Sequence, residues 1–132
     1  DHDAIIAGLT FEEKEERWLR ENGYRFIKER TFVLHEGESI EGPVVIWGAT
    51  SVILDGIVHG NIAVLSSNLV VHGTIDGDLE LISVSETLIA EQGVVTGDIR
   101  GKFIEMPALH LRIEGKVGGN AEGSIRDIEW AN

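Results

Sequence analysis

The sequence has 132 residues, no cysteine, and 23 acidic against 11 basic side chains, so its formal net charge is −12. This length predicts one domain around one core, while the lack of cysteine excludes disulfides and thiolate metal sites, and no apolar stretch reaches the roughly 18 residues of a membrane span. The acidic balance disfavours nucleic-acid binding and direct docking on anionic lipid, because both surfaces are negatively charged.

The first predicted element is a helix over residues 11–22. Thr10 and Glu13 have the spacing of a capping box, in which each side chain bonds a backbone amide at the start of the helix. Phe11 and Trp18 lie seven residues apart and give the helix one narrow apolar stripe. We expect this stripe to pack over one end or one side of the following domain. A partner-binding helix is the alternative.

From residue 32 onward, short stretches of Val, Ile and Leu alternate with small polar residues, which is typical of many short strands. A six-residue frame, G-x-[IV]-x-G-[ND], occurs four times, and its first glycines are 17, 20 and 22 residues apart. Its glycines and final Asn or Asp, which we take as repeat corners, are Gly56, Gly60, Asn61, Gly73, Gly77, Asp78, Gly93, Gly97, Asp98, Gly115, Gly119 and Asn120. Four residues before each frame stands an apolar column of Val52, Leu69, Ile89 and Leu111.

The aligned repeats predict an all-β fold, a single-stranded β-helix solenoid preceded by a short N-terminal α-helix. No single unit can bury its apolar face alone, whereas about five to six stacked rungs share one continuous core. Each strand would pair with its copy in the next rung, about 4.8 Å away. The expected organisation is a helix and lead-in segment at 1–31, the β-helix domain at 32–127, and a C-terminal tail or cap at 128–132.

The frame fits structural corners better than a ligand-binding loop. The Val or Ile between the glycines is expected to point into the core, and the glycines to form bends where a Cβ is costly or φ is positive. The Asn or Asp suits a turn, and mutual repulsion predicts that Asp78 and Asp98 are exposed to solvent. No ligand set repeats between the copies, so the sequence predicts no catalytic, cofactor-binding or metal-binding residue and no cofactor.

The histidines share no column of the repeat. His35, His59, His72 and His110 stand at four different offsets from the first glycine of their units, so we expect them at the surface or at corners. His59 and His72 are the one pair placed to face each other across a rung boundary.

Several large apolar residues fall outside the repeat. Phe103 lies in the longest stretch between frames, and Pro107, which cannot donate a ladder hydrogen bond, predicts that this stretch bulges from the rod. Ile128 and Trp130 follow the last frame and either cap the C-terminal end or contact another rod, since the exposed strand edges lie at the ends. The candidate interface or cap residues are therefore Phe11, Trp18, Phe103, Ile128 and Trp130.

The recurring segments VHGNI, IDGDLEL, VTGDIRG and VGGNAEG resemble the bactofilins, a family of bacterial polymer-forming cytoskeletal proteins. The resemblance covers about residues 40–127 and rests on four copies of the motif in register. It implies a right-handed β-helix that self-associates end to end without nucleotide, as a non-enzymatic scaffold for cell-envelope or cytoskeletal organisation. It also implies protein partners and a cytoplasmic location, at the inner face of the membrane if a segment outside this sequence supplies that contact.

Two other classes of protein remain open. Apolar columns six residues apart also fit the hexapeptide repeats of left-handed β-helix enzymes, acyltransferases or γ-carbonic-anhydrase-like proteins, although the unequal rungs and scattered histidines weigh against them. A β-helix binding module for carbohydrate or protein is the second alternative, although the four Phe, three Trp and one Tyr do not line up on one face.

Overall fold

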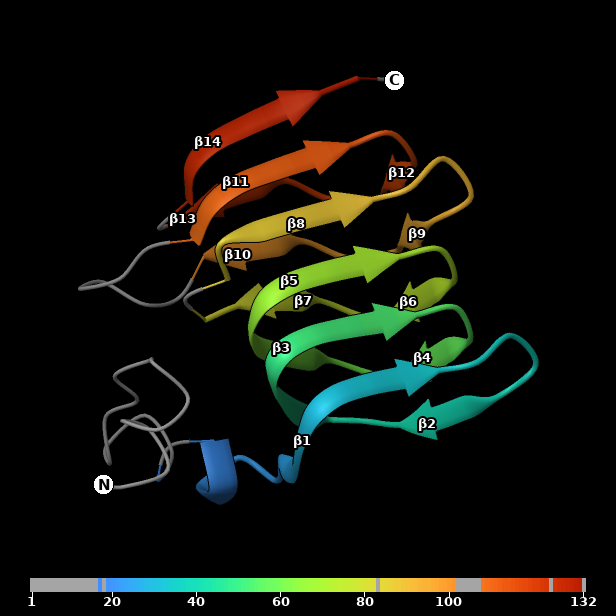
Figure 1. Ribbon diagram of the computed structural model, residues 1–132, viewed down its shortest axis with the longest axis vertical. Helices are drawn as coiled ribbons and strands as arrows, with labels where there is room; N and C mark the ends of the chain where they lie inside the picture. Colours follow the sequence, from blue (N-terminus) through green and yellow to red (C-terminus); the bar gives the residue numbers. More distant parts are fainter. Residues whose placement is uncertain (1–16, 18, 83, 102–107, 124, 132) are drawn as a thin grey trace.

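The computed structural model describes residues 17, 19–82, 84–101, 108–123 and 125–131, and these residues form a β-solenoid of about five coils (Figure 1). The predicted all-β solenoid is therefore confirmed. Its strands run parallel to their neighbours in the coils above and below, and they form three faces along the rod. The first two faces belong to one nine-stranded sheet, and the third face is a separate five-stranded sheet.

Three long strands bend from the first face onto the second, and shorter strands continue the faces separately. The long strands are β1 (Arg25–Leu34), β3 (Val44–Leu54) and β5 (Ile62–Val71). The first face continues with β7 (Leu79–Leu81), β10 (Ile99–Gly101) and β13 (Ala121–Gly123). The second face continues with β8 (Glu86–Ile89), β11 (Ala108–Ile113) and β14 (Ile125–Trp130). The third face consists of β2 (Ser39–Glu41), β4 (Ile57–His59), β6 (Thr74–Asp76), β9 (Val94–Val95) and β12 (Lys116–Val117).

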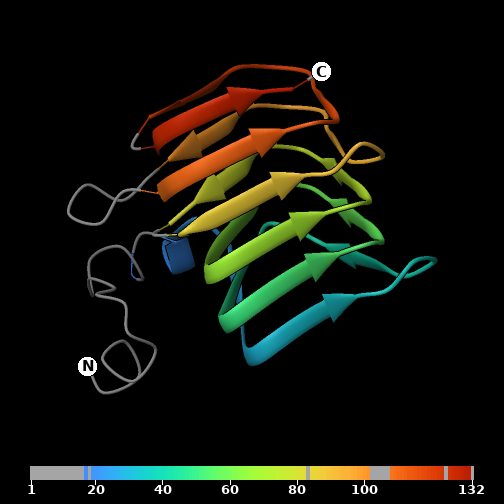
Figure 2. The same ribbon diagram turned by 45° about the horizontal axis from the view of Figure 1, so that its top comes forward.

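The coils rise with a right-handed turn. In Figure 1 the near strands run from left to right, and the chain climbs towards the C-terminus as it returns behind them. Figure 2 shows the second-face strands stacked in chain order, so that β1 and β14 lie at opposite ends of the rod. Hexapeptide-repeat enzymes, which the apolar columns six residues apart had suggested, have a left-handed coil, and the right-handed coil seen here does not favour them.

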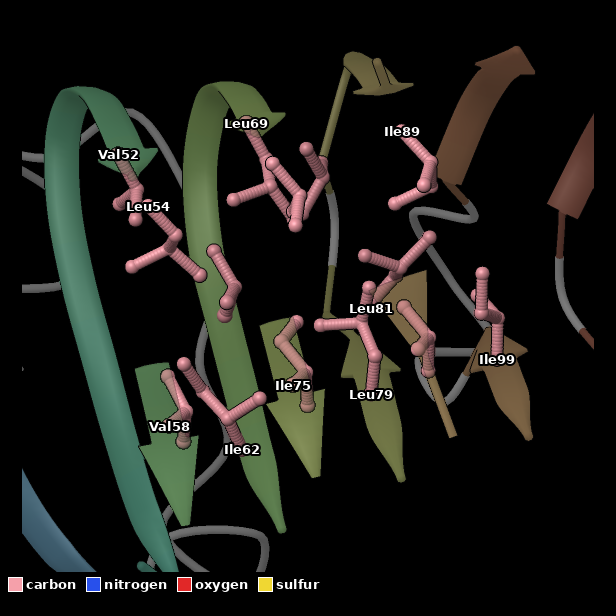
Figure 3. Close-up of a cluster of buried hydrophobic side chains, with 14 of the residues drawn as sticks. Val52, Leu54, Val58, Ile62, Leu69, Ile75, Leu79, Leu81, Ile89 and Ile99 are labelled. Carbon is pink, nitrogen blue, oxygen red and sulfur yellow. The ribbon is translucent and has the colours of Figure 1, made fainter. Parts of the chain in front are cut away.

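Alternating apolar residues of the strands fill the interior. Val58, Ile75 and Val95, which are the middle residues of three frames, are each 0 % exposed. They stack in register from β4 through β6 to β9, as predicted for an inward column of β-branched side chains. Figure 3 shows such side chains from successive coils packed side by side in the interior. Burying each one contributes about 1.5–3 kcal/mol, so the stacked columns are the main source of stability.

Both boundaries of the predicted β-helix domain need correction. The solenoid begins at Arg25 rather than at residue 32, because β1 pairs along its length with β3. It also extends past residue 127, since β14 pairs with β11 and places Ile128 against Leu111 and Trp130 against Ile113. The segment predicted as a C-terminal tail or cap is thus mostly the last strand of the final coil.

The predicted helix lies mostly outside the described residues, but its C-terminal part packs on one side of the rod. Arg17 and residues 19–21 are helical. Leu19 is 3 % exposed, and Leu19 and Tyr24 pack on an apolar cluster on the outside of the first face. The residues of the rod in this cluster are Phe26, Val45, Trp47, Ala63, Leu65 and Ile82. The expectation that this segment packs against the domain holds for Leu19.

One predicted column is out of register in the fourth coil. Ile89 pairs with Val71 and Ile113, whereas the partner of Leu69 and Leu111 is Thr87. The cause is a longer turn, because four positions separate Ile89 from Gly93 but only two separate the equivalent residues of the coil below. A threonine therefore occupies a core column that was predicted to be wholly apolar.

Candidate functional sites: the Asn/Asp ladder and the ends of the rod

The final Asn or Asp of each frame belongs to a continuous hydrogen-bonded ladder. The amide of Asp78 donates to Asn61 Oδ1, the amide of Asp98 donates to Asp78 Oδ1, and the amide of Asn120 donates to Asp98 Oδ1, each at 2.9 Å. Each side chain thus accepts a hydrogen bond from the backbone of the coil above. The expectation that Asp78 and Asp98 are exposed to solvent was wrong, because each is only partly exposed and uses one carboxylate oxygen to accept an amide of the coil above.

The same ladder explains the second glycine of the frame. A Cβ on Gly97 would overlap Asp78 Oδ1, and a Cβ on Gly119 would overlap Asp98 Oδ1. At these two positions the glycine leaves room for the carboxylate of the coil below, which is a different reason from the bend or positive φ that the sequence suggested. The predicted corner residues therefore interlock between coils.

Arg100 forms ion pairs with both aspartates of the ladder. Its Nη2 lies 2.8 Å from Asp78 Oδ2 and its Nη1 lies 3.2 Å from Asp98 Oδ2. The amide of Asp98, followed by Arg100, holds the pKa of Asp78 below its ordinary value, although partial burial acts in the opposite direction. The side chains of Asp78 and Asp98 are 29 % and 34 % exposed, so they are partly buried ion-pair partners rather than free surface charges.

A second polar contact, which the sequence did not reveal, fastens the lead-in segment to the side of the rod. The hydroxyl of Tyr24 donates to Glu80 Oε1 at 3.1 Å, and Glu80 is only 4 % exposed. Burial, and then the charge of Glu80, raise the pKa of Tyr24 to about 12. The two residues are 56 positions apart, and the column of Glu80 contains Ala63 and Arg100 in the neighbouring coils, so no residue type recurs there.

The histidines are separate from one another, as expected, and two of them pair with carboxylates of a neighbouring coil. His72 Nδ1 lies 2.7 Å from Asp55 Oδ1, and His110 Nδ1 lies 2.9 Å from Asp127 Oδ2. His59 is in register with Glu41 and Asp76 on the third face, so it does not face His72 as the candidate pair required. The described residues contain no group of three His, Cys, Asp or Glu side chains that could hold a metal ion.

The outer surface of the second face has a shallow depression of about 250 Å³ beside His110. Its polar lining includes Glu86, His110 and Arg112. Both basic side chains already contact carboxylates, since His110 binds Asp127 and Arg112 contacts Glu114 and Glu129. The depression therefore offers no unengaged cationic group to a ligand.

The C-terminal end of the rod presents the core columns to solvent. Trp130, which continues the column of Ile113, is 51 % exposed, and Ile128, which continues the column of Leu111, is partly buried. Within the described residues, β14 pairs with β11 alone, so one edge of its backbone is open. Of the other candidate interface residues, Phe11, Trp18 and Phe103 lie outside the part of the chain that the structure describes.

No protein-family model, curated protein or solved structure matches this chain. Among the described residues, no helix is long and apolar enough to cross a bilayer.

Proposed function

We propose that this protein is a non-enzymatic scaffold of the bactofilin type, which self-associates through its solenoid and supports cell-envelope or cytoskeletal organisation. The observation that carries the proposal is the open C-terminal coil. There, Trp130 ends a core column and is 51 % exposed, on a strand with one open backbone edge.

An open coil is a self-complementary surface. An unpaired strand edge presents amides and carbonyls that a further strand can satisfy, and the end of an apolar column gains free energy when another apolar side chain covers it. Trp130 and Ile128 supply the apolar part of this surface, and β14 supplies the backbone part. A second copy of the same chain offers both at once.

The proposed setting is the cytoplasm, with protein partners and no nucleic acid. The net charge of −12 repels phosphate backbones and anionic lipid. Contact with the inner face of the membrane would need a segment other than the described solenoid.

Replacing Trp130 with Asp tests the proposal. We expect the wild-type chain to sediment as associated species at high concentration without nucleotide, and Trp130→Asp to sediment as a monomer, because a charge at the end of the column opposes burial by a second copy. Ile57→Asp is the matched control. Ile57 is also a large exposed apolar residue, 43 % exposed, but it lies on the third face along the side of the rod.

Both variants should keep the circular dichroism spectrum and melting behaviour of the folded chain, because both side chains are exposed. If Trp130→Asp associated as strongly as the wild type, or if Ile57→Asp abolished association and Trp130→Asp did not, contact through the C-terminal coil would be ruled out.

A further inference from the structure

We infer that the outside of the first face is a docking surface for a basic amphipathic helical segment of a protein partner, and that the lead-in segment of this chain occupies the surface in the free protein. The described part of the lead-in segment is Arg17 and residues 19–24. The surface lies on the side of the rod, so docking there does not depend on association through the ends.

The outside of the first face is apolar over three coils. Phe26, Val45 and Ala63 stand in register on β1, β3 and β5, and Trp47 and Leu65 form a second column beside them. All of these residues except Phe26 are 5 % exposed or less. A contiguous apolar surface on the outside of a fold is typical of a site of protein contact.

This degree of burial is particular to the first face. Ile53 and Val70 are paired outward residues of the second face, and both are partly exposed. Solvent therefore reaches the outside of the second face, whereas Leu19 and Tyr24 pack on the outside of the first face. The apolar side chains of the first face gain free energy from such a cover.

The lead-in segment presents its contact residues through a fixed turn. The amide of Tyr24 donates to the carbonyl of Leu19, the amide of Gly23 donates to that of Arg20, and Gly23 has φ +85°. These are the two hydrogen bonds of a Schellman motif, which ends a helix and brings together the side chains that flank the turn. Leu19 and Tyr24 therefore project together onto the apolar surface.

Side chains, and not a strand ladder, attach the lead-in segment to the rod. Strand pairing begins only with β1, after the segment ends. The hydroxyl of Tyr24 donates to Glu80 Oε1 at 3.1 Å, and the guanidinium of Arg20 lies 4.1 Å from the centre of the Phe26 ring. The described part of the segment takes part in no strand pair, so its departure leaves the pairing of the coils intact.

These contacts define the chemistry of a partner segment. It needs an apolar side chain in place of Leu19, a cation in place of Arg20 and a hydrogen-bond donor in place of Tyr24. The donor matters most, because Glu80 is 4 % exposed and a buried carboxylate that loses a donor is costly.

Charge favours a partner segment over the chain's own segment. Residues 11–24 carry five acidic and three basic side chains, a net charge of −2, and the rest of the chain carries −10. The two parts therefore repel each other, whereas a basic segment with the same contacts is attracted to the rod. A basic helix of this pattern competes with the lead-in segment for the surface.

Trp47 reports whether the surface is covered. The chain has three tryptophans, so replacing Trp18 and Trp130 with Phe leaves Trp47 as the single one. We expect acrylamide to quench Trp47 weakly in this background and more strongly after Leu19→Asp, because a carboxylate is not stable on an apolar surface. Ile57→Asp, on the third face, is the matched control and should leave the quenching unchanged. Protection of Trp47 that survives Leu19→Asp would contradict the inference.

Peptides with the sequence of residues 11–24, with phenylalanine in place of the tryptophan, are the probes for docking. The parent peptide should restore the protection of Trp47 in the Leu19→Asp chain. A peptide that also carries Tyr24→Phe should bind about tenfold more weakly, because Glu80 then loses its donor. A peptide whose first four glutamates are replaced by glutamine should bind more tightly at low salt, because its net charge is +2 instead of −2.

The same titrations can overturn the inference. No binding at millimolar peptide, or equal binding of all three peptides, would rule out a docking surface of this chemistry. Dimers of Leu19→Asp without peptide would show that the uncovered surface takes a second copy instead. If Leu19→Asp unfolds by circular dichroism, Tyr24→Phe in the full chain gives the same readout, and unchanged quenching of Trp47 there would also count against the inference. Each readout reports on the side of the rod, so it is separate from the proposed association through the C-terminal coil.

Discussion

At the scale of single residues, the alternation of Asn and Asp in the frame reflects what the two side chains share. Both carry an Oδ1 that accepts the amide of the coil above, and Asn61 and Asp78 do so at the same distance of 2.9 Å. Only the carboxylate can also bind Arg100. The ladder therefore needs an acceptor at every coil but a charge only where the arginine is.

Substitutions of Asp78 separate its role as a hydrogen-bond acceptor from its role as a charge. Asp78→Ala leaves the amide of Asp98 without its acceptor and should destabilise the fold by about 1–2 kcal/mol. Asp78→Asn keeps the acceptor and should cost less, as only the ion pair is lost. Denaturant unfolding at neutral pH measures both changes. Equal costs for the two variants would contradict the acceptor role of Oδ1.

Acid titration of stability tests the charge of Asp78. Its pKa is lowered in the folded chain, so its contribution is present above the unfolded pKa of about 4 and is lost as the pH falls through the folded value. The wild type should therefore lose more stability than Asp78→Asn below about pH 4. Parallel pH profiles for the two proteins would show that the ion pair with Arg100 contributes nothing.

Thr87 is a second residue whose environment predicts a measurable effect. Among the described residues, its Oγ1 is the buried side-chain oxygen without a hydrogen-bond partner, and it stands in a column between Leu69 and Leu111. Thr87→Val replaces the hydroxyl with a methyl group of similar size and should raise the unfolding free energy by about 1 kcal/mol.

Ser66 supplies the control for Thr87, because its hydroxyl is equally buried but donates to the carbonyl of Asn68 at 2.9 Å. Ser66→Ala should lower stability, in contrast to Thr87→Val. Chemical denaturation measures the unfolding free energy of both variants. A loss of stability in Thr87→Val would mean that the hydroxyl of Thr87 is hydrogen-bonded in solution.

Sequence reasoning found the frame residues but missed the residues that pair with them. Arg100, Tyr24 and Glu80 each occur once, whereas the alignment detects only features that recur in every coil. Tyr24 and Glu80 meet across 56 positions because the coils bring distant segments together. No local spacing carries that information.

At the scale of the element, the third-face strands show that the same residue type is interior at one position of a strand and exposed at the next. β4 and β6 are neighbours, and Ile57 is 43 % exposed whereas Ile75 is 0 % exposed. The difference arises from the alternation of side chains along a strand. Ile75 is the middle residue of its frame and points inward, and Ile57 precedes the middle residue of its own frame.

Ile75→Asp should unfold the solenoid. It places an unpaired carboxylate in a closed apolar column, a change expected to cost more than about 4 kcal/mol. Ile57→Asp, one strand away, should change the unfolding free energy by about 0.5 kcal/mol or less. Thermal melts followed by circular dichroism compare the two, and a folded, cooperative Ile75→Asp would contradict the assignment of this column to the core.

The glycine frames located the coils that contain them. Residues 25–31 of β1 were assigned to the lead-in segment instead of the β-helix domain, in part because no frame precedes them and because the pairing of β1 with β3 shifts register between Glu29 and Thr31. Such a shift breaks the two-residue alternation on which strand prediction depends. Ile89 was assigned to the wrong column for a related reason, since a longer turn separates it from the next frame.

At the scale of the whole molecule, both ends of the described rod leave a strand edge open. Within the described residues, β1 pairs with β3 alone and β14 pairs with β11 alone, and Trp130 on β14 is 51 % exposed. The side of the rod is partly covered by Leu19 and Tyr24 of the lead-in segment, together with Phe26 of β1. The acidic charge of −12 per chain opposes any association, so added salt should strengthen self-association by screening that charge.

The most direct test of self-association is sedimentation velocity of the unmodified chain over a wide concentration range, without nucleotide, at low and high salt. We predict a monomer that converts to associated species as concentration rises, with the conversion shifted to lower concentration by salt. A single monomeric species at every concentration and salt would contradict assembly through the open C-terminal coil.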